Sequence, residues 1–125
     1  FQLLTLSSEE SKEFKGLGIL PFSTVRLSVK NTTLNKVPHL GWNNICSSSK
    51  ESKLLRGIES ERQVFYYSNA YGILKPDSFE QTHACYFHEK EIIALVEYKN
   101  IYGVQFHPEK SRIQGLKLLN NFLKI

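Results

Sequence analysis

The residues with the clearest chemical potential are His107 and Glu109, which Pro108 separates at the end of a short apolar run. Proline disfavours the helical region for the residue before it, so we expect His107 to be extended. Side chains two apart on an extended chain point to the same side. The Glu109 carboxylate can then lie beside the imidazole, fix its tautomer and stabilise the imidazolium. This spacing provides the base and the orienting carboxylate of a nucleophilic triad.

The sequence does not show a nucleophile to complete that triad. Cys46 is followed by a serine-rich stretch and lacks the glycine-flanked strand-to-helix turn that a nucleophile needs, so we interpret it as a bystander thiol. Four further groups raise the possibility of a metal site: His83, Cys85, His88 and Glu89. We predict no metal and no cofactor, because a hairpin would not make these side chains converge.

Composition sets broad limits on the class of protein. A chain of 125 residues with 41% hydrophobic and 22% charged residues is typical of one globular domain. The net charge of +4 comes from scattered basic residues, so we expect no nucleic-acid partner. No apolar run approaches the roughly 20 residues that span a bilayer, so no membrane partner is expected. Two cysteines make no disulfide framework, which favours a cytoplasmic protein.

Alternating apolar residues predict short strands, one of which leads into the His-Pro-Glu stretch. A polar, hairpin-like connection joins two of the predicted strands, Gln81–Phe87 and Ile92–Glu97. Loops are expected between these strands, and the second loop is rigid with a partly buried tryptophan. The strands are Phe22–Val29, Gln63–Tyr71, Gln81–Phe87 and Ile92–Glu97, and the loops are Lys30–Asn35, Val37–Asn43 and Cys46–Lys50.

Helices are expected mainly at the two ends of the chain. Phe1–Phe14 has a crowded apolar first half and a polar second half, and glycines follow it. Ser52–Ile58 is predicted to form one or two helical turns. A C-terminal helix begins with Ser111 and Gln114, which match a capping box. Its apolar stripe is expected to pack on a sheet, and comprises Ile113, Leu116, Leu119, Phe122 and Leu123.

The whole stretch Tyr102–Ser111 resembles the His-Pro-Glu signature of class I glutamine amidotransferases. The resemblance implies an α/β fold, with a mostly parallel central sheet flanked by helices and an antiparallel patch in this half. It also implies an enzyme in which a cysteine attacks the side-chain amide of glutamine and ammonia is released. On this alignment His107 is the base and Glu109 the orienting group.

A second segment, Pro38–Asn43, resembles the branch of that family that forms the glutaminase subunits of imidazole glycerol phosphate synthases. This implies a role in histidine biosynthesis and a heterodimer with a cyclase subunit of (β/α)8 type, which receives the ammonia. In that branch Trp42 would lie at the docking surface, and Lys110 would face the cyclase. Asn69 departs from the branch, which has histidine there, so a paralogue with another synthase partner is a second hypothesis, for instance in amidination of a surface sugar.

The beginning of the chain also resembles a family segment, the one that follows the nucleophile cysteine. The resemblance implies that Gln2 and Glu10 help to hold the amino-acid end of the substrate. It places the cysteine three residues before Phe1, which agrees with a chain that contains no methionine. Residues 1–125 are then expected to be the C-terminal part of a single amidotransferase domain. A catalytically inactive docking subunit is the third hypothesis, and the residues before Phe1 would discriminate.

Overall fold

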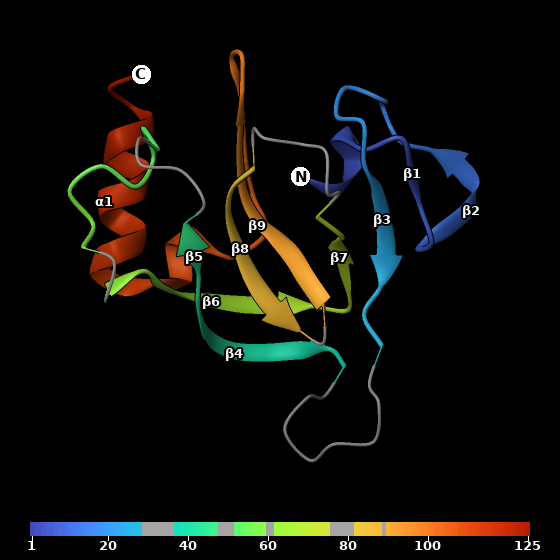
Figure 1. The fold of residues 1–125 in the computed structure, drawn as a ribbon, viewed down its shortest axis with the longest axis horizontal. Coiled ribbons are helices and arrows are strands. Elements are labelled where there is room, and N and C mark those ends of the chain that lie inside the picture. The colour runs from blue at the N-terminus through green and yellow to red at the C-terminus, as the bar shows by residue number, and fades with distance from the viewer. Residues whose placement is uncertain (29–36, 48–51, 60–61, 76–81, 89) are drawn as a thin grey trace.

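The computed structural model describes residues 1–28, 37–47, 52–59, 62–75, 82–88 and 90–125. In these ranges the chain forms three small sheets with one α-helix at the side (Figure 1). The strand pairs are antiparallel except β1 with β3, which is parallel. The antiparallel patch expected in this half of the fold is therefore present.

The sheet that leads to the His-Pro-Glu stretch has the strand order β10-β9-β8-β5. β9 runs through its middle, and its residues Ile92–Val96 are at most 1% exposed. Such a continuous apolar run is typical of a strand buried on both faces. The predicted strands Gln81–Phe87 and Ile92–Glu97 are confirmed, since β8 and β9 cover nearly all of both ranges and pair with each other antiparallel. The four strands are β5 (Cys46–Ser47), β8 (Thr82–His88), β9 (Lys90–Tyr98) and β10 (Ile101–Val104).

The prediction of a helix over Phe1–Phe14 is wrong. Only a 3-10 turn forms, and an antiparallel hairpin follows it. The buried Thr5 hydroxyl contacts Gln2 O at 2.7 Å and Thr24 Oγ1 at 3.2 Å, which draws the chain away from a helix and onto the next strand. Gly16 packs so closely on Thr5 that a Cβ would lie 1.9 Å from its carbonyl oxygen. The elements are η1 (Gln2–Leu4), β1 (Ser7–Ser8), β2 (Ser11–Lys15), β3 (Ser23–Arg26) and β7 (Tyr71–Ile73), in the sheet order β2-β1-β3-β7.

The segment expected to be a rigid loop is instead a strand, β4 (His39–Asn44), which pairs with β6 (Val64–Asn69). Side chains of β4 alternate between half-buried and exposed, and Leu40 and Trp42 are on the exposed face at 64% and 43%. The hydrogen-bonded pairing with an aromatic strand determines this conformation. Trp42 lies opposite Tyr66 in the register.

Two other predicted connections also differ from the structure. The loop predicted at Cys46–Lys50 begins as the short strand β5, in which Cys46 pairs with Cys85. Ser52–Ile58 forms hydrogen-bonded turns rather than a helix. The Glu97 carboxylate holds these turns by accepting bonds from the Ser52 hydroxyl and from the Leu54 amide. The predicted loop at Lys30–Asn35 lies outside the described residues, and β3 occupies the first part of the predicted strand Phe22–Val29.

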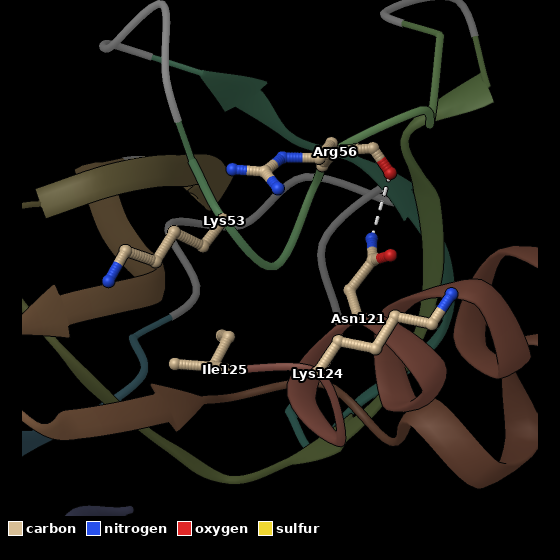
Figure 2. Close-up of a pocket in the computed structure, with 5 residues that line it drawn as sticks. All are labelled: Lys53, Arg56, Asn121, Lys124 and Ile125. Carbon is tan, nitrogen blue, oxygen red and sulfur yellow. Dashed lines mark hydrogen bonds between the residues drawn. The ribbon is translucent and has the colours of Figure 1, made fainter.

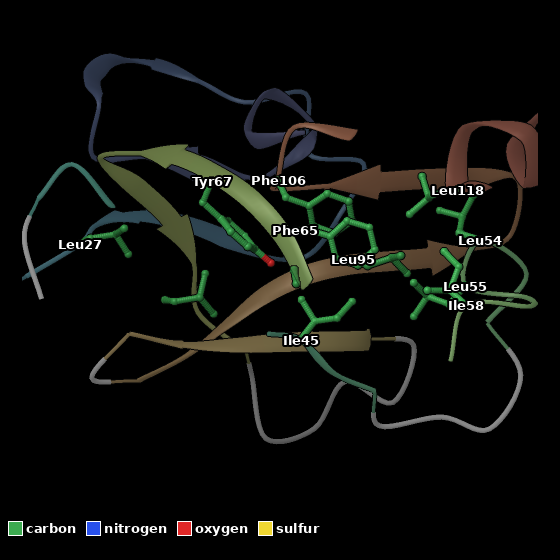
Figure 3. Close-up of a cluster of buried hydrophobic side chains, with 12 residues drawn as sticks. Leu27, Ile45, Leu54, Leu55, Ile58, Phe65, Tyr67, Leu95, Phe106 and Leu118 are labelled. Atoms are coloured by element: carbon green, nitrogen blue, oxygen red, sulfur yellow. The ribbon is translucent and has the colours of Figure 1, made fainter. Parts of the chain in front are cut away.

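The larger hydrophobic core joins the β4–β6 ribbon to the central sheet and to the helix (Figure 3). Phe106 is 3% exposed and stacks on Phe65 with ring centroids 4.1 Å apart, and Tyr67 meets it edge-on at 5.8 Å. Because Phe106 immediately precedes His107, this aromatic cluster anchors the chain at the predicted base.

The C-terminal helix is present as α1 (Arg112–Phe122), but a different face is buried from the one predicted. Gly115 and Leu118 are its buried residues, whereas every residue of the predicted apolar stripe is at least 38% exposed. Ser111 makes no side-chain capping bond, so the capping box with Gln114 is wrong too. Within the described residues, no helix is long and apolar enough to cross a membrane.

Candidate active site

His107 and Glu109 lie together as the spacing predicted. Nδ1 of His107 is 2.8 Å from Oε1 of Glu109, and the two side chains are 34% and 59% exposed. His107 has extended backbone angles, and Pro108 begins the 3-10 turn η3 (Pro108–Lys110). An imidazole held at Nδ1 by a carboxylate presents its other nitrogen for proton transfer, which is the arrangement of a base in a nucleophilic triad.

Two residues hold the backbone of His107 on both sides. Its amide donates to the Tyr66 carbonyl at 2.8 Å, and its carbonyl accepts a bond from the Ser111 hydroxyl at 2.6 Å. The same hydroxyl accepts a bond from the Tyr66 amide at 3.0 Å, which closes a ring of hydrogen bonds between β6 and the start of α1. Ser111 is fully buried, so water does not compete for these bonds.

Gly115 brings α1 against the turn that carries Glu109. A Cβ at this position would lie 1.8 Å from the Pro108 carbonyl oxygen, a distance that no side chain tolerates. The Gly115 amide also donates to the Ser111 carbonyl at 3.0 Å. The helix therefore approaches η3 closely enough to fix Ser111, and through it His107.

The Glu109 carboxyl is held in its charged form. Its pKa is lowered from the usual 4.5, mainly by a hydrogen bond with its own backbone and then by the bond with His107. A carboxylate that is ionised throughout the neutral range can orient the imidazole and stabilise its protonated form.

Beside this pair lies an aromatic surface with two cations. The ring of Tyr66 lies 6.5 Å from the His107 ring and meets Trp42 edge-on at 5.8 Å. Nζ of Lys110 lies 5.8 Å from the centre of the Tyr66 ring, and Cζ of Arg112 lies 4.9 Å from the centre of the Trp42 ring. Cation–π contacts at exposed sites contribute about 0.5–1 kcal/mol each. The predicted interface residues Trp42 and Lys110 are thus brought close to His107.

Gln2 and Glu10 lie elsewhere. Both line a cavity of about 240 Å³ beside the β1–β2 hairpin, and the Gln2 side-chain amide donates to the Tyr71 carbonyl at 3.1 Å. His107 does not line this cavity, and Figure 1 shows the hairpin and α1 at opposite sides of the molecule. The structure therefore places the two predicted substrate residues together but not beside the predicted base.

A larger cavity of about 430 Å³ opens between the 52–58 turns and the end of α1 (Figure 2). Its lining includes Lys53, Arg56 and Lys124, and Asn121 donates to the carbonyls of Leu54 and Arg56. The ammonium groups of Lys53 and Lys124 point to opposite sides in Figure 2, so the charges do not converge on one ligand.

No three His, Cys, Asp or Glu side chains of the described residues are grouped so that they could hold a metal ion. The thiol of Cys46 is free and exposed. Of the groups considered for a metal, Glu89 lies outside the described residues, and the other three are on β8.

The whole chain matches a known protein family. The model of the family "Glutamine amidotransferase class-I" matches residues 1–125, so the chain belongs to that family. The resemblance drawn from Tyr102–Ser111 is confirmed. The fold agrees, since a crystal structure from Thermoplasma acidophilum, assigned to a subunit of GMP synthase, superimposes with a TM-score of 0.57 at 20% identity. That comparison covers 83% of this chain and 48% of the other.

Curated relatives are more similar in sequence. The chain is 41% identical to imidazole glycerol phosphate synthase subunit HisH 2 of Methanococcus maripaludis, with 98% of this chain and 57% of the relative covered. It is 39% identical to subunit HisH of Pyrococcus furiosus, with 99% and 60% covered, and 38% identical to that of Pelagibacter ubique, with 93% and 54% covered. The chain thus spans a little over half the length of these relatives.

Three residues near His107 were not identified from the sequence. Tyr66 falls inside the predicted strand Gln63–Tyr71 with no sign of a role of its own, and Ser111 is expected only as part of a helix cap. Arg112 gave no signal, because its contact with Trp42 depends on the approach of α1 to β4. The adjacency of Ser111 to the His-Pro-Glu stretch was the one available clue for its contact with His107.

Proposed function

We propose that this chain is part of a glutaminase that hydrolyses glutamine to glutamate and delivers the ammonia to a synthase subunit. The observation that carries the proposal is the 2.8 Å contact between Nδ1 of His107 and Oε1 of Glu109. In a member of the class I family, that pair is suited to serve as the base and its orienting group.

The cysteine thiol, His107 and Glu109 each have one role in the proposed reaction. A cysteine nucleophile, which we place in the segment before Phe1, attacks the side-chain amide carbon of glutamine as His107 takes the proton of the thiol. His107 then gives that proton to the amide nitrogen as the C–N bond breaks, so the nitrogen leaves as ammonia and a glutamyl thioester remains. Water attacks the thioester with the help of the same imidazole, and glutamate leaves as the thiol is restored. Glu109 keeps the imidazole in one tautomer and stabilises its charged form in both steps.

The partner we propose is the (β/α)8 cyclase subunit of imidazole glycerol phosphate synthase, in a heterodimer located in the cytoplasm. Similarity to subunits of that synthase over nearly the whole chain supports this choice. Trp42 and Lys110 would lie at the contact between the subunits, since both are exposed and close to His107. We also propose that Gln2 and Glu10 help to bind the substrate glutamine.

Asn69, the departure from the branch, occupies a structural position in this chain. It is 8% exposed, and its side-chain amide donates to the Gln105 carbonyl at 3.2 Å, two residues before His107. Its role is compatible with the triad, because it holds the backbone that leads from β10 to His107. No contact of Asn69 within the described residues points to a different partner.

Reconstitution tests the proposal. The full-length protein is mixed with the cyclase subunit of the same organism and its ribotide substrate, and either glutamine or an ammonium salt supplies nitrogen. We expect imidazole glycerol phosphate from both nitrogen sources, and one glutamate for each product formed from glutamine. Product from ammonium alone, with no glutamate from glutamine, would support an inactive docking subunit instead.

A further inference from the structure

The β4–β6 ribbon, the turn η3 and the start of α1 contribute to one surface, which we call the docking face. It comprises the exposed Leu40, Trp42, Lys110 and Arg112 and the half-buried Tyr66. Leu40 and Trp42 are large apolar side chains at 64% and 43% exposure on the same side of β4. Trp, Tyr and Arg are the residues most enriched among those that dominate binding energy at protein interfaces. The face is continuous with His107 through Tyr66.

Arg112 has an unusual backbone on this face. Its φ is +52°, in the left-handed region that residues other than glycine rarely adopt. Such conformations cluster at functional sites, where the surrounding structure holds them. The fully buried Ser111 precedes Arg112 and is tied to β6. The guanidinium lies 4.9 Å from the centre of the Trp42 ring, so it covers one face of that indole.

The charge of the docking face is not neutralised within the described residues. Neither Lys110 nor Arg112 forms an ion pair with a carboxylate there. The neighbouring carboxylate, Glu109, is engaged with His107. Two cations are therefore fixed over two adjacent aromatic rings, Lys110 on Tyr66 and Arg112 on Trp42.

We propose that Arg112 makes the docking face selective for an acidic surface on the synthase subunit, with a partner carboxylate paired to the guanidinium that covers Trp42. This rests on the proposed function and specifies the chemistry of its partner. The planar fork of arginine can stack on the indole and bind a carboxylate at the same time, which lysine does poorly. A cationic partner group would meet like charge on this side of the indole. Charge therefore selects the partner, while the apolar atoms of Leu40 and Trp42 supply contact area.

The test measures the affinity of the full-length protein for the cyclase subunit of the same organism by titration calorimetry, at low and high salt. Arg112→Glu reverses the charge, and Arg112→Gly removes the side chain while accepting the left-handed backbone without strain. Arg112→Lys keeps the charge but not the planar stack. Lys117→Glu, an equal charge reversal at an exposed position of the same helix, is the matched control.

We expect Arg112→Gly to weaken binding at least about fivefold and Arg112→Glu at least about tenfold, with Arg112→Lys between wild type and Arg112→Gly. Added salt should weaken the wild-type complex more than the Arg112→Gly complex. Replacing the partner's facing carboxylate by lysine should restore binding to Arg112→Glu. The Lys117→Glu control should bind within about twofold of wild type, as expected for a charge outside the contact.

The outcomes separate this inference from the proposed function. Wild-type binding and glutamine-dependent product, together with unchanged affinity of Arg112→Glu, would overturn the role of Arg112 alone. Equal loss of affinity in Lys117→Glu would show a general charge effect and would also overturn it. Absence of both binding and glutamine-dependent product in wild type would overturn the inference and the proposed function together. Self-association of the free protein through this face would replace the synthase by a second copy as its occupant.

Discussion

Glu109 combines high exposure with a contact that acts on the neighbouring base. Its carboxyl is 59% exposed, so the ion pair with His107 adds little to stability, typically about 0–1 kcal/mol. Its value lies in orientation, because an imidazole bonded at Nδ1 cannot rotate freely. The lowered pKa of Glu109 means that this contact is present through the neutral range.

The titration of Glu109 gives the first prediction. Its pKa in the folded protein lies below 4.5, and in His107→Ala it should rise towards 4.5 without reaching it, because the hydrogen bond with its own backbone is the largest cause of the shift. Lys110→Ala should move it less, since that charge is the smallest cause. Carbon NMR of the Glu109 side-chain carboxyl measures its pKa in the wild type and in each of the two variants. A larger rise in Lys110→Ala than in His107→Ala would contradict this order of causes.

The sign of the pH dependence follows from the same shift. A carboxyl whose folded pKa is lowered stabilises the fold above its unfolded pKa, and this contribution is lost as the pH falls through the folded pKa. The contact of Glu109 with His107 should thus persist on acidification past pH 4.5, the ordinary pKa of the carboxyl, and be lost as the pH falls through the lower pKa of the folded protein.

Trp42 carries a separate prediction about the partner. Trp42→Ala should weaken association with the cyclase by about 2 kcal/mol, or about 30-fold, because an exposed tryptophan among aromatic and arginine neighbours is typical of a binding hot spot. Leu40→Ala on the same strand is the matched control and should cost less, since leucine rarely dominates interfaces. Unaltered affinity of Trp42→Ala in a titration would leave the ring a purely structural role.

At the residue scale, the sequence is most informative where chemistry and backbone are locally linked. The contact of His107 with Glu109 joins residues two apart, so it could be predicted, although the 3-10 turn η3, rather than an extended chain through Glu109, brings the carboxylate to the imidazole. The contacts of Ser111 with Tyr66 and of Arg112 with Trp42 could not be, because they join segments about 45 and 70 residues apart and depend on how a helix meets a ribbon.

At the scale of elements, the approach of α1 to η3 determines the position of the His-Pro-Glu stretch. Gly115→Ala should therefore destabilise the full-length protein by about 1–3 kcal/mol and lower its activity, because the new methyl group would overlap the Pro108 carbonyl oxygen. Urea denaturation and glutamine hydrolysis measure the two effects.

Gln114→Ala is the control for that variant. It changes the adjacent helix residue, which would matter if Gln114 formed a capping box with Ser111, a contact that the structure lacks. We expect a change within about 0.5 kcal/mol, as for an ordinary surface substitution. Equal destabilisation by both variants would show that the helix in general, rather than its contact with η3, is sensitive.

The strands were more predictable than the helices, for physical reasons. The apolar runs of β6 and β9 pair into sheets that satisfy both their period and their burial, and β8 pairs with β9 as its own run predicted. The segment Phe1–Phe14 has helix-like composition, yet the hydroxyl of Thr5 and the hydrogen bond from the Leu6 amide to the Phe22 carbonyl join it to β3 instead. Tertiary pairing overrides a weak local preference of this kind.

At the scale of the whole molecule, the apolar stripe of α1 is the main unexplained surface. Ile113, Leu116 and Leu123 are 59%, 62% and 82% exposed, on the face that the sequence predicted to be buried. The relatives are longer than this chain, which covers 57% of the one from Methanococcus maripaludis. We propose that residues 1–125 are the C-terminal part of one domain, whose other part covers this stripe.

The stability of the isolated segment tests that proposal. Because net stability is typically only about 5–15 kcal/mol, exposure of a helix face that is normally covered should prevent a stable monomer. Residues 1–125 expressed alone should show a broad thermal melt or self-association. A sharp cooperative transition from a monomer would show that the segment is a complete domain and that the stripe is an ordinary surface.

The most direct test of the triad compares glutamine hydrolysis by the full-length protein with that of its His107→Ala and Glu109→Gln variants, each assayed with the cyclase present. We expect His107→Ala to lose about 10⁴–10⁶-fold in rate, as when a triad base is removed. Glu109→Gln should lose less, because the amide still contacts the imidazole but no longer carries charge. Comparable rates in wild type and His107→Ala would contradict the assignment of His107 as the base.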